Sequence, residues 1–219
     1  MPLGFARDRP LDFARDRPFD VRAEVIDNVS LSPDYNVLAL AAPEVAAAAS
    51  PGQFVMIKAG RGHDPLLRRP FSVFEVLRDA SGRISGLSLL NKRIGPSTGL
   101  VYEARRGDHV DCLGPLGRPF SIVDRPSGAW MVAGGVGLAP FAALAAALRD
   151  RSVPTTLFYG ARSAGELFYL QFFRDLGVEL VLTTEDGSAG ERGRIVAPLE
   201  RRLAAHAEDA PVMVYACGP

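Results

Sequence analysis

The spacing of apolar residues changes once along the chain, near residues 124–128. Before this point, short apolar runs are broken by glycine and proline, and no long helical period occurs. After it, strand-like runs alternate with helix-like segments. A chain of 219 residues can hold two small domains. We therefore predict domains over 20–124 and 125–219, preceded by a flexible Arg/Pro-rich tail at 1–19.

The front half is predicted to be a small antiparallel Greek-key barrel. Turn signals such as Ser50-Pro51-Gly52 separate its apolar runs, and regular short strands with Gly/Pro turns are typical of barrels. The segment 100–111 is predicted as a turn and a strand. The other predicted strands cover residues 21–29, 36–40, 53–58, 71–77 and 86–92.

The back half is predicted to be a Rossmann-like parallel sheet, because strands that alternate with helices require crossover connections. The predicted strands are 130–133, 155–159, 179–183 and 212–217, and the helices are 140–149, 165–173 and 196–206. The chain stops on a strand that would normally be followed by a covering helix, so we expect a C-terminally truncated domain.

One stretch, 126–148, carries no charge over 23 residues, which is long enough to span a bilayer. Its central glycines and Pro140 favour a strand, a tight turn and a buried helix instead. The N-terminus lacks the apolar core of a signal peptide. We therefore predict a cytoplasmic protein without a membrane association.

Composition excludes several other classes of protein. Lys plus Arg and Asp plus Glu each number 25, so nothing favours a nucleic-acid partner. Two cysteines and three histidines, without metal-ligand spacing, predict no metal site in this chain.

The motif Arg69-Pro70-Phe71-Ser72 opens a predicted strand. A guanidinium can hold a pyrophosphate through two parallel hydrogen bonds. The phenyl ring could lie against an isoalloxazine, and the hydroxyl or a backbone amide could bond near its N5 edge. Taken alone, the motif is more often an ordinary edge strand that carries a solvated arginine.

A second motif, Gly95-Pro96-Ser97-Thr98-Gly99, follows the strand that ends at Lys92. Small residues and hydroxyls allow backbone N–H groups to approach a phosphate, although a plain surface turn is an equal alternative. The spacing Gly-x-Ser-x-Gly also fits a hydrolase nucleophile elbow. That elbow needs a helix after the serine, and 100–111 is not predicted as one.

A third motif, Gly135-Val-Gly137-Leu-Ala-Pro140, follows a predicted strand. Its glycines permit a tight turn at a dinucleotide pyrophosphate, and the following helix offers free N–H groups. Pro140 replaces the third glycine of the usual fingerprint. A glycine-rich packing turn is the structural alternative.

Three further motifs end the later strands, where open parallel sheets bind ligands. They are Tyr159-Gly-Ala-Arg162-Ser, Thr184-Glu-Asp-Gly-Ser-Ala-Gly190 and Ala-Cys217-Gly-Pro. Arg162 could contact a ribose or phosphate, and Cys217 would lie near a nicotinamide. A solvated arginine, ordinary turn chemistry and a buried structural thiol remain open alternatives.

The ordered set of motifs, with Gly-Pro-Leu-Gly at 114–117 between the second and third, resembles the ferredoxin–NADP reductase superfamily. The segments 67–72 and 184–190 look most like the electron transfer subunit of the NAD-dependent, class 1B dihydroorotate dehydrogenase. The resemblance implies FAD in the barrel, NAD(P) in the second domain and an FMN-containing catalytic subunit as partner, in a heterotetramer. It also implies a role in pyrimidine (UMP) biosynthesis.

The resemblance further implies which residues contact the cofactors. FAD would be bound by Arg69, Pro70, Phe71, Ser72, Leu90, Asn91, Lys92, Ser97 and Thr98. Gly135, Gly137, Pro140 and Cys217 would line the nicotinamide side. The family's [2Fe-2S] cysteines lie beyond Cys-Gly-Pro, so the cluster ligands are not in this chain. Asn91 and Ser97 also depart from the family pattern, which has an aromatic and a glycine there.

The leading hypothesis is an oxidoreductase that exchanges a hydride with nicotinamide and single electrons with an iron–sulfur centre through FAD. No catalytic acid or base is required. One alternative is an NAD(P)H–ferredoxin reductase-like subunit of another redox complex. Another, of a different class, is a non-catalytic fragment that only binds a partner. The choice between NAD and NADP stays open from the residues.

Overall fold

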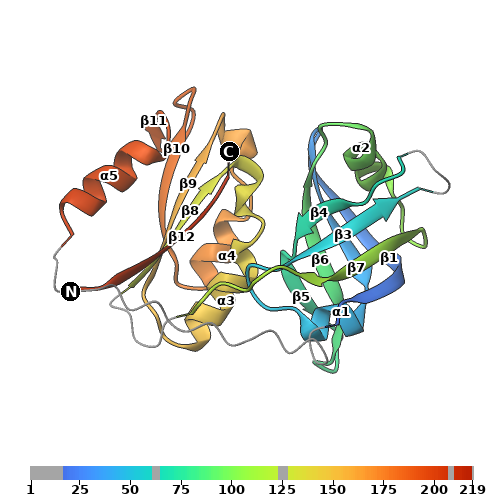
Figure 1. Ribbon diagram of the computed structural model, residues 1–219. Helices are drawn as coiled ribbons and strands as arrows, with labels where there is room; N and C mark the ends of the chain where they lie inside the picture. The colour runs from blue at the N-terminus through green and yellow to red at the C-terminus, as the bar shows by residue number, and fades with distance from the viewer. Residues whose placement is uncertain (1–16, 61–64, 123–127, 207–209, 219) are drawn as a thin grey trace.

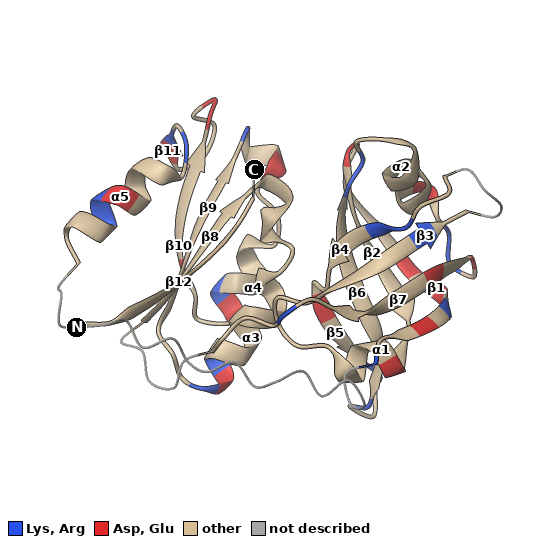
Figure 2. Ribbon diagram, viewed as in Figure 1, with Lys and Arg blue, Asp and Glu red and all other residues tan. Residues whose placement is uncertain are grey.

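The computed structural model describes residues 17–60, 65–122, 128–206 and 210–218. Two β-sheets, one antiparallel and one parallel, form two lobes that lie side by side (Figure 1). Most of the predicted tail and the predicted domain boundary lie outside the described residues. Acidic and basic residues are interspersed over both lobes (Figure 2). The predicted fold class, an antiparallel barrel-like sheet followed by a Rossmann-like α/β unit, is confirmed.

The first sheet has seven antiparallel strands in the order β4-β3-β7-β1-β2-β6-β5. In chain order they are β1 (Phe19–Ser32), β2 (Tyr35–Ala41), β3 (Phe54–Ala59), β4 (Arg69–Ser72), β5 (Glu75–Arg78), β6 (Ile84–Lys92) and β7 (His109–Leu116).

The two edge strands of this sheet, β4 and β5, are consecutive in the chain. The expected single strand over 71–77 is therefore wrong: it is two short strands separated by Val73 and Phe74. The break occurs because the backbone changes partner. The Val73 N–H donates to the Gln53 carbonyl beside β3, whereas the Phe74 N–H donates to the Ser88 carbonyl in β6. This change of partner brings the sheet edges together and curls it towards a barrel.

Two helices belong to this lobe, α1 (Pro43–Ala48) and α2 (Pro96–Glu103). The expectation of a turn and strand over 100–111 is wrong in its first part, since 96–103 is helical and only 109–116 is a strand. A capping box that starts α2 explains the difference. The Thr98 hydroxyl accepts from the N–H groups of Ile94 and Gly95 and donates to the Gly95 carbonyl.

The second sheet is parallel, in the order β11-β10-β9-β8-β12. Its strands are β8 (Gly128–Gly134), β9 (Thr155–Ala161), β10 (Glu179–Thr184), β11 (Glu191–Arg192) and β12 (Val212–Cys217). The helices are α3 (Phe141–Asp150), α4 (Leu170–Asp175) and α5 (Val196–Ala204), with short 3₁₀ turns η1 (Gly135–Leu138) and η2 (Ala164–Glu166).

Strand order reverses at β8 in this sheet. The chain proceeds from β8 to β9 and β10 on one side and then returns to place β12 on the other. The crevice at such a reversal, outside the carboxyl ends of the strands, is where open α/β sheets bind ligands. The carboxyl ends of β8 and β12 therefore mark the expected ligand position in this lobe.

A shared hydrophobic core joins the two lobes. One buried cluster contains Tyr35, Phe74 and Leu90 of the first lobe together with residues of α3 and the parallel sheet. The Ala143 N–H donates to the Phe74 carbonyl at 3.0 Å across the boundary. A separate cluster fills the barrel. The lobes are thus packed as one unit rather than merely tethered.

The uncharged stretch 126–148 forms β8, η1 and α3 over its described part, as predicted. Within the part of the chain that the structure describes, every helix is too short or too polar to cross a membrane.

Candidate functional site

The predicted FAD residues of β4 lie at the edge of the first sheet. Arg69 and Pro70 are exposed and Ser72 is half-buried. The Arg69 guanidinium makes one long hydrogen bond, at 3.4 Å, to the Arg68 carbonyl. Within the described residues it forms no ion pair, which leaves most of its donors available for an anion.

Phe71 is placed differently from the expectation. Its side chain is 8% exposed and packs in the barrel core with residues such as Val55 and Val73. Alternation along a strand sends its ring to the opposite face from its neighbours. Only the backbone of Phe71, and not its ring, is therefore placed to meet a flavin.

The predicted residues of β6 are also mostly buried. Leu90 belongs to the core that the lobes share, and Asn91 is completely buried. Lys92 is half-buried, and its ammonium lies 5.1 Å from the ring centroid of Tyr35, within cation–π range.

Asn91 links β6 to helix α2. Its amide donates to the Asn36 side chain at 2.7 Å and to the Thr98 carbonyl at 3.0 Å. Asn36 in turn donates to Asn28, whose amide bonds the carbonyls of Val101, Tyr102 and Ala104 at 3.3, 3.0 and 2.7 Å. The three asparagines thus hold α2 on the sheet. Asn91 acts on the predicted phosphate turn by positioning it.

The turn itself presents fewer free groups than its sequence suggests. The Thr98 hydroxyl gives its single hydrogen to Gly95, so this side chain cannot also donate to a phosphate. Ser97 is half-buried, and its hydroxyl makes no hydrogen bond within the described residues. The Ser97 hydroxyl and the free backbone N–H groups at the start of α2 therefore remain the candidate donors. A helix does follow Ser97, but within the described residues no histidine or carboxylate forms a hydrogen bond with its hydroxyl.

Exposed apolar side chains flank these two motifs. Among the residues that the structure describes, the three most exposed large hydrophobic side chains are Ile94 (78%), Leu67 (64%) and Leu66 (63%). Leu66 and Leu67 lead into β4, and Ile94 leads into the turn before α2. Such exposure is typical of surfaces that a ligand or partner covers. An arginine with available donors, a helix start and uncovered apolar side chains are the features that a flavin nucleotide site would use.

The predicted nicotinamide residues meet at the strand-order reversal. Gly135 has a positive φ of +52° in η1, Pro140 precedes α3, and Cys217 ends β12. A Cβ on Gly137 would lie 2.2 Å from the Cys217 carbonyl oxygen. The structure thus brings Gly137 and Cys217 into direct contact, and Gly137 is required for packing rather than for space beside a ligand.

Burial raises the pKa of the Cys217 thiol above its ordinary value, which favours the protonated form. Cys112 lies in the barrel core, where burial raises its pKa to about 12. Neither thiol has the character of a metal ligand or nucleophile. Within the described residues, no group of three or more His, Cys, Asp or Glu side chains could hold a metal ion.

The loops after β9 and β10 form the rest of this edge. The Arg162 guanidinium forms an ion pair with the Glu166 carboxylate. The hydrogen bond in this pair is the main cause of the raised pKa of Arg162. The Ser188 hydroxyl donates to Asp186 at 2.6 Å and accepts from the Ala164 N–H at 2.7 Å. Bonding to Ser188 lowers the Asp186 pKa, so that carboxylate stays ionised. At this edge Arg162 is paired with Glu166, and Asp186 contributes a negative charge.

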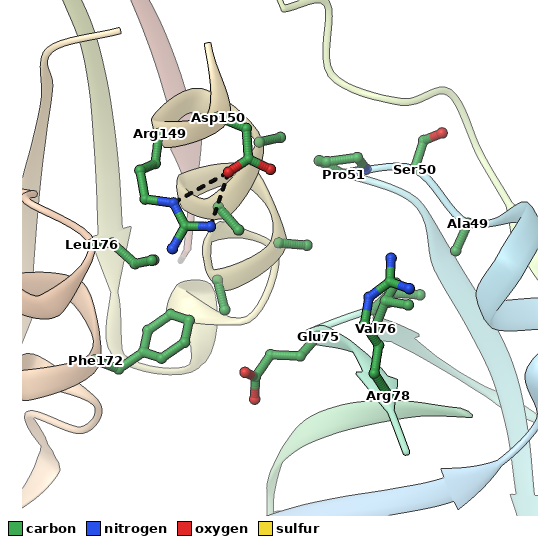
Figure 3. A pocket seen from close by; sticks show the side chains of 15 residues that line it. Ala49, Ser50, Pro51, Glu75, Val76, Arg78, Arg149, Asp150, Phe172 and Leu176 are labelled. Atoms are coloured by element: carbon green, nitrogen blue, oxygen red, sulfur yellow. Dashed lines mark hydrogen bonds and ion pairs between the residues drawn. The ribbon is translucent and has the colours of Figure 1, made fainter. Parts of the chain in front are cut away.

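A cavity of about 440 Å³ also lies between the lobes (Figure 3). The alanine-rich face of α3 and Phe172 of α4 form one wall, and Glu75 and Arg78 of β5 project from the other. None of the predicted cofactor residues lines this cavity. Burial raises the pKa of Glu75, and its hydrogen bond to Ser88 offsets part of that rise.

Tyr35, Phe168 and Tyr169 at the lobe interface are not predicted from the sequence. The Tyr35 and Phe168 ring centroids are 4.9 Å apart, and Tyr169 contacts Phe74 edge-on at 4.7 Å. Isolated aromatic residues give no signal of a contact between lobes. Tyr35 is the register partner of Lys92 across β2 and β6. Knowledge of this register would have placed Tyr35 beside a predicted cofactor residue.

Comparisons with known proteins agree with this geometry. Residues 131–219 match the oxidoreductase NAD-binding domain family. The chain is 33% identical to the dihydroorotate dehydrogenase B (NAD(+)) electron transfer subunit of Desulforamulus reducens, over 90% of this chain and 72% of that protein. It is 35% identical to the subunit of the same name from Geobacillus thermodenitrificans, over 83% of this chain and 68% of that protein.

Among solved structures, an NADH-dependent reduced ferredoxin-NADP oxidoreductase studied for flavin-based electron bifurcation superposes with a TM-score of 0.76. It is 27% identical, over 91% of this chain and 68% of that chain. The chain is thus an FAD-dependent NAD(P)H oxidoreductase subunit. It belongs to the family of dihydroorotate dehydrogenase B electron transfer subunits, within the ferredoxin–NADP reductase superfamily.

Proposed function

We propose that this chain carries electrons between a dihydroorotate-oxidising partner subunit and NAD through bound FAD, in the cytoplasm, as a step of pyrimidine biosynthesis. The relatives' names, which describe the electron transfer subunit of a dihydroorotate dehydrogenase, support the partner. The pathway is what the family resemblance implies. The observation that carries the proposal is the contact of Gly137 with Cys217 at the strand-order reversal. This contact places the predicted nicotinamide turn at the carboxyl edge of the parallel sheet, in a lobe that packs against the predicted flavin residue Leu90.

We assign FAD to residues 20–124 and the nicotinamide nucleotide to residues 125–219, which is the division predicted from the sequence. Arg69 binds the FAD pyrophosphate, assisted by the Ser97 hydroxyl and the first N–H groups of α2. The backbone of Pro70 to Ser72 faces the isoalloxazine. Asn91 keeps α2 in place, and Lys92 lies between this site and the second lobe.

The nicotinamide dinucleotide binds across η1, with its pyrophosphate beside Gly135. Pro140 fixes the start of α3, and Cys217 closes the turn from β12. Negative charge from Asp186, together with the engagement of Arg162 by Glu166, favours a ribose with a free 2′-hydroxyl over a 2′-phosphate. The proposal therefore specifies NAD.

FAD would supply the chemistry, because it can exchange one hydride, which carries two electrons, with nicotinamide and pass electrons on singly. The protein's own groups bind and orient it, and none of them acts as an acid or base. The chain does not offer the four thiolates of a [2Fe-2S] cluster, since Cys112 and Cys217 are its only cysteines. No step is therefore assigned to a cluster in this chain.

A second candidate is an NAD(P)H–ferredoxin reductase-like subunit of another complex. The superposition on the bifurcating oxidoreductase, with a TM-score of 0.76, favours it. Co-purification separates the two proposals, because only the first predicts that an FMN-containing, dihydroorotate-oxidising subunit is retained. A non-catalytic partner-binding role predicts retention of a partner without NADH oxidation after FAD is added.

The flavin site is tested by comparing Arg69→Ala with the control Arg83→Ala. Arg83 is an exposed arginine on the β5–β6 hairpin and pairs with Asp79. Loss of the charge-assisted bonds in Arg69→Ala should weaken FAD binding about 10-fold or more. Arg83→Ala should leave it unchanged. Equal FAD affinity in both variants, measured by quenching of flavin fluorescence, would remove Arg69 from the site.

A further inference from the structure

Tyr35 is the first residue of β2, yet its ring reaches into the second lobe. The side chain is 1% exposed and lies in the core that both lobes share. Phe168 packs against its ring, and Lys92 approaches the same ring from the barrel side. Tyr35 therefore stands between the predicted flavin strand and the nicotinamide edge.

The hydroxyl of Tyr35 is buried and has no hydrogen-bond partner within the described residues. Buried tyrosine hydroxyls normally have a partner, because an unpaired buried donor is costly. The other tyrosines of the shared core illustrate the rule. The Tyr159 hydroxyl donates to the Glu166 carbonyl and the Tyr215 hydroxyl to the Ser121 carbonyl, both at 2.9 Å.

The unpaired hydroxyl points at the glycine turn. A Cβ placed on Gly135 would lie 3.5 Å from the Tyr35 oxygen, so the hydroxyl is next to the first glycine after β8. It is also near the end of β9. Burial is the main cause of the raised Tyr159 pKa, and Tyr35 adds to it electrostatically. The hydroxyl thus faces the carboxyl edge of the parallel sheet.

We propose, building on the proposed function, that Tyr35 is a nucleotide-positioning residue whose hydroxyl donates a hydrogen bond to a pyrophosphate oxygen of the dinucleotide held at the Gly135 turn. A phenol is a good donor to an anionic oxygen, and this bond satisfies the buried hydroxyl. The first lobe then supplies a direct contact to the nucleotide bound by the second.

The segment that packs against Tyr35 has a backbone feature that would let it move aside for a phosphate. Phe168 lies over Tyr35, and the next residue, Tyr169, has a left-handed φ of +59°, which is strained for a side chain of this size. In this proposal Phe168 moves to give a phosphate at the Gly135 turn access to the hydroxyl, so the contact forms only when the nucleotide binds.

The matched variants are Tyr35→Phe and Tyr102→Phe. Each removes one hydroxyl, but the Tyr102 hydroxyl is bonded within the first lobe to the Ser32 carbonyl at 2.8 Å. With FAD-loaded protein, calorimetry gives the dissociation constants for NAD⁺, ADP-ribose and AMP. ADP-ribose keeps the pyrophosphate without nicotinamide, and AMP has neither. Thermal unfolding gives the structural effect of each change.

Tyr35→Phe should weaken NAD⁺ and ADP-ribose about 10-fold each and leave AMP unchanged, without lowering the unfolding temperature. Tyr102→Phe should lower the unfolding temperature and leave all three affinities unchanged. If NAD⁺ and ADP-ribose each bound wild type and Tyr35→Phe with the same affinity, this inference would be overturned but the proposed function would not. A loss confined to NAD⁺ would have the same consequence. A wild-type protein that binds FAD but no NAD⁺ would overturn the proposed function as well.

Discussion

The backbone N–H of Ala143 donates a 3.0 Å hydrogen bond to the carbonyl of Phe74. Ala143 lies in the first turn of α3, where N–H groups lack partners within the helix. The sequence predicts that the helix after the glycine turn offers free N–H groups, but the Ala143 N–H is not one of them. It instead fastens the second lobe to the segment between β4 and β5.

Proline at position 143 should weaken the attachment of the lobes. Ala143→Pro removes the N–H but is tolerated in the first turn of a helix, and it leaves the buried Phe74 carbonyl unpaired. We expect a loss of about 1–3 kcal/mol in the free energy of unfolding, measured with urea. Ala143→Ser, which keeps the N–H, is the control. A similar loss in both variants would show that the hydrogen bond is not the cause.

Alanine at position 137 should be severely destabilising. The new methyl would lie 2.2 Å from the Cys217 carbonyl oxygen, and both groups belong to backbone that cannot move independently. The loss should exceed about 3 kcal/mol, with NAD binding abolished. Gly99→Ala is the matched control, because no atom lies within 4 Å of its Cβ position in α2.

Gly99→Ala should instead be neutral or stabilise the protein by up to about 1 kcal/mol, because alanine has a higher helix propensity than glycine. Thermal unfolding of the two variants in the same buffer measures both effects. Tolerance of alanine at 137 would contradict the packing of η1 on β12.

The pH dependence of stability should reveal Glu75 in the cavity between the lobes. Burial raises its pKa, so the folded state binds a proton more tightly than the unfolded state. The carboxyl therefore stabilises the fold at low pH, and this contribution is lost as pH rises through the raised pKa. Glu75→Gln should be more stable than wild type at neutral pH, with the difference closing towards pH 4.5.

Asp79 on the same hairpin provides a control of opposite sign. Its pKa is lowered, chiefly by the Ser81 hydroxyl, so it stabilises the fold above its unfolded pKa and loses this effect as pH falls. Asp79→Asn should be less stable than wild type at neutral pH and equal to it in acid. Urea unfolding across a pH series tests both variants. If the free energy of unfolding of Glu75→Gln varied with pH in parallel with that of wild type, this carboxyl would be well solvated.

Much of the second lobe could be predicted because its elements carry local signals. The strand over 212–217 and the α3 and β10 segments match the structure within about a residue at each end. Helix α2 was not predicted, because Gly95 and Gly99 weigh against a helix, although Pro96 at its first position is a helix-start signal. It depends on asparagine side chains from three strands, which only the folded sheet brings together.

The candidate site was predictable in its motifs but not in its side-chain orientations. Arg69 and Ser97 are accessible, whereas Phe71 and Asn91 are buried by strand alternation and by the helix above them. Tyr35 had no sequence signal, because its position depends on how the two lobes pack. Sequence motifs identify which segments meet a cofactor, and packing decides which atoms do.

The role of Asn91 as a positioning residue can be separated from direct cofactor contact. Asn91→Ala removes its bonds to Asn36 and Thr98, which should cost about 2–4 kcal/mol of stability and weaken FAD binding together. In an Asn36→Ala background the same substitution should cost less, because the network is already broken. Fully additive losses in a double-mutant cycle would contradict the network.

The central claim is that the first lobe holds FAD where a nicotinamide nucleotide on the second lobe can reduce it. The most direct test is an anaerobic titration of the FAD-reconstituted chain with NADH, followed by the absorbance of the flavin. The account predicts stoichiometric FAD binding and bleaching of the flavin by NADH. A folded chain that binds no FAD, or that holds FAD which NADH does not bleach, would contradict it.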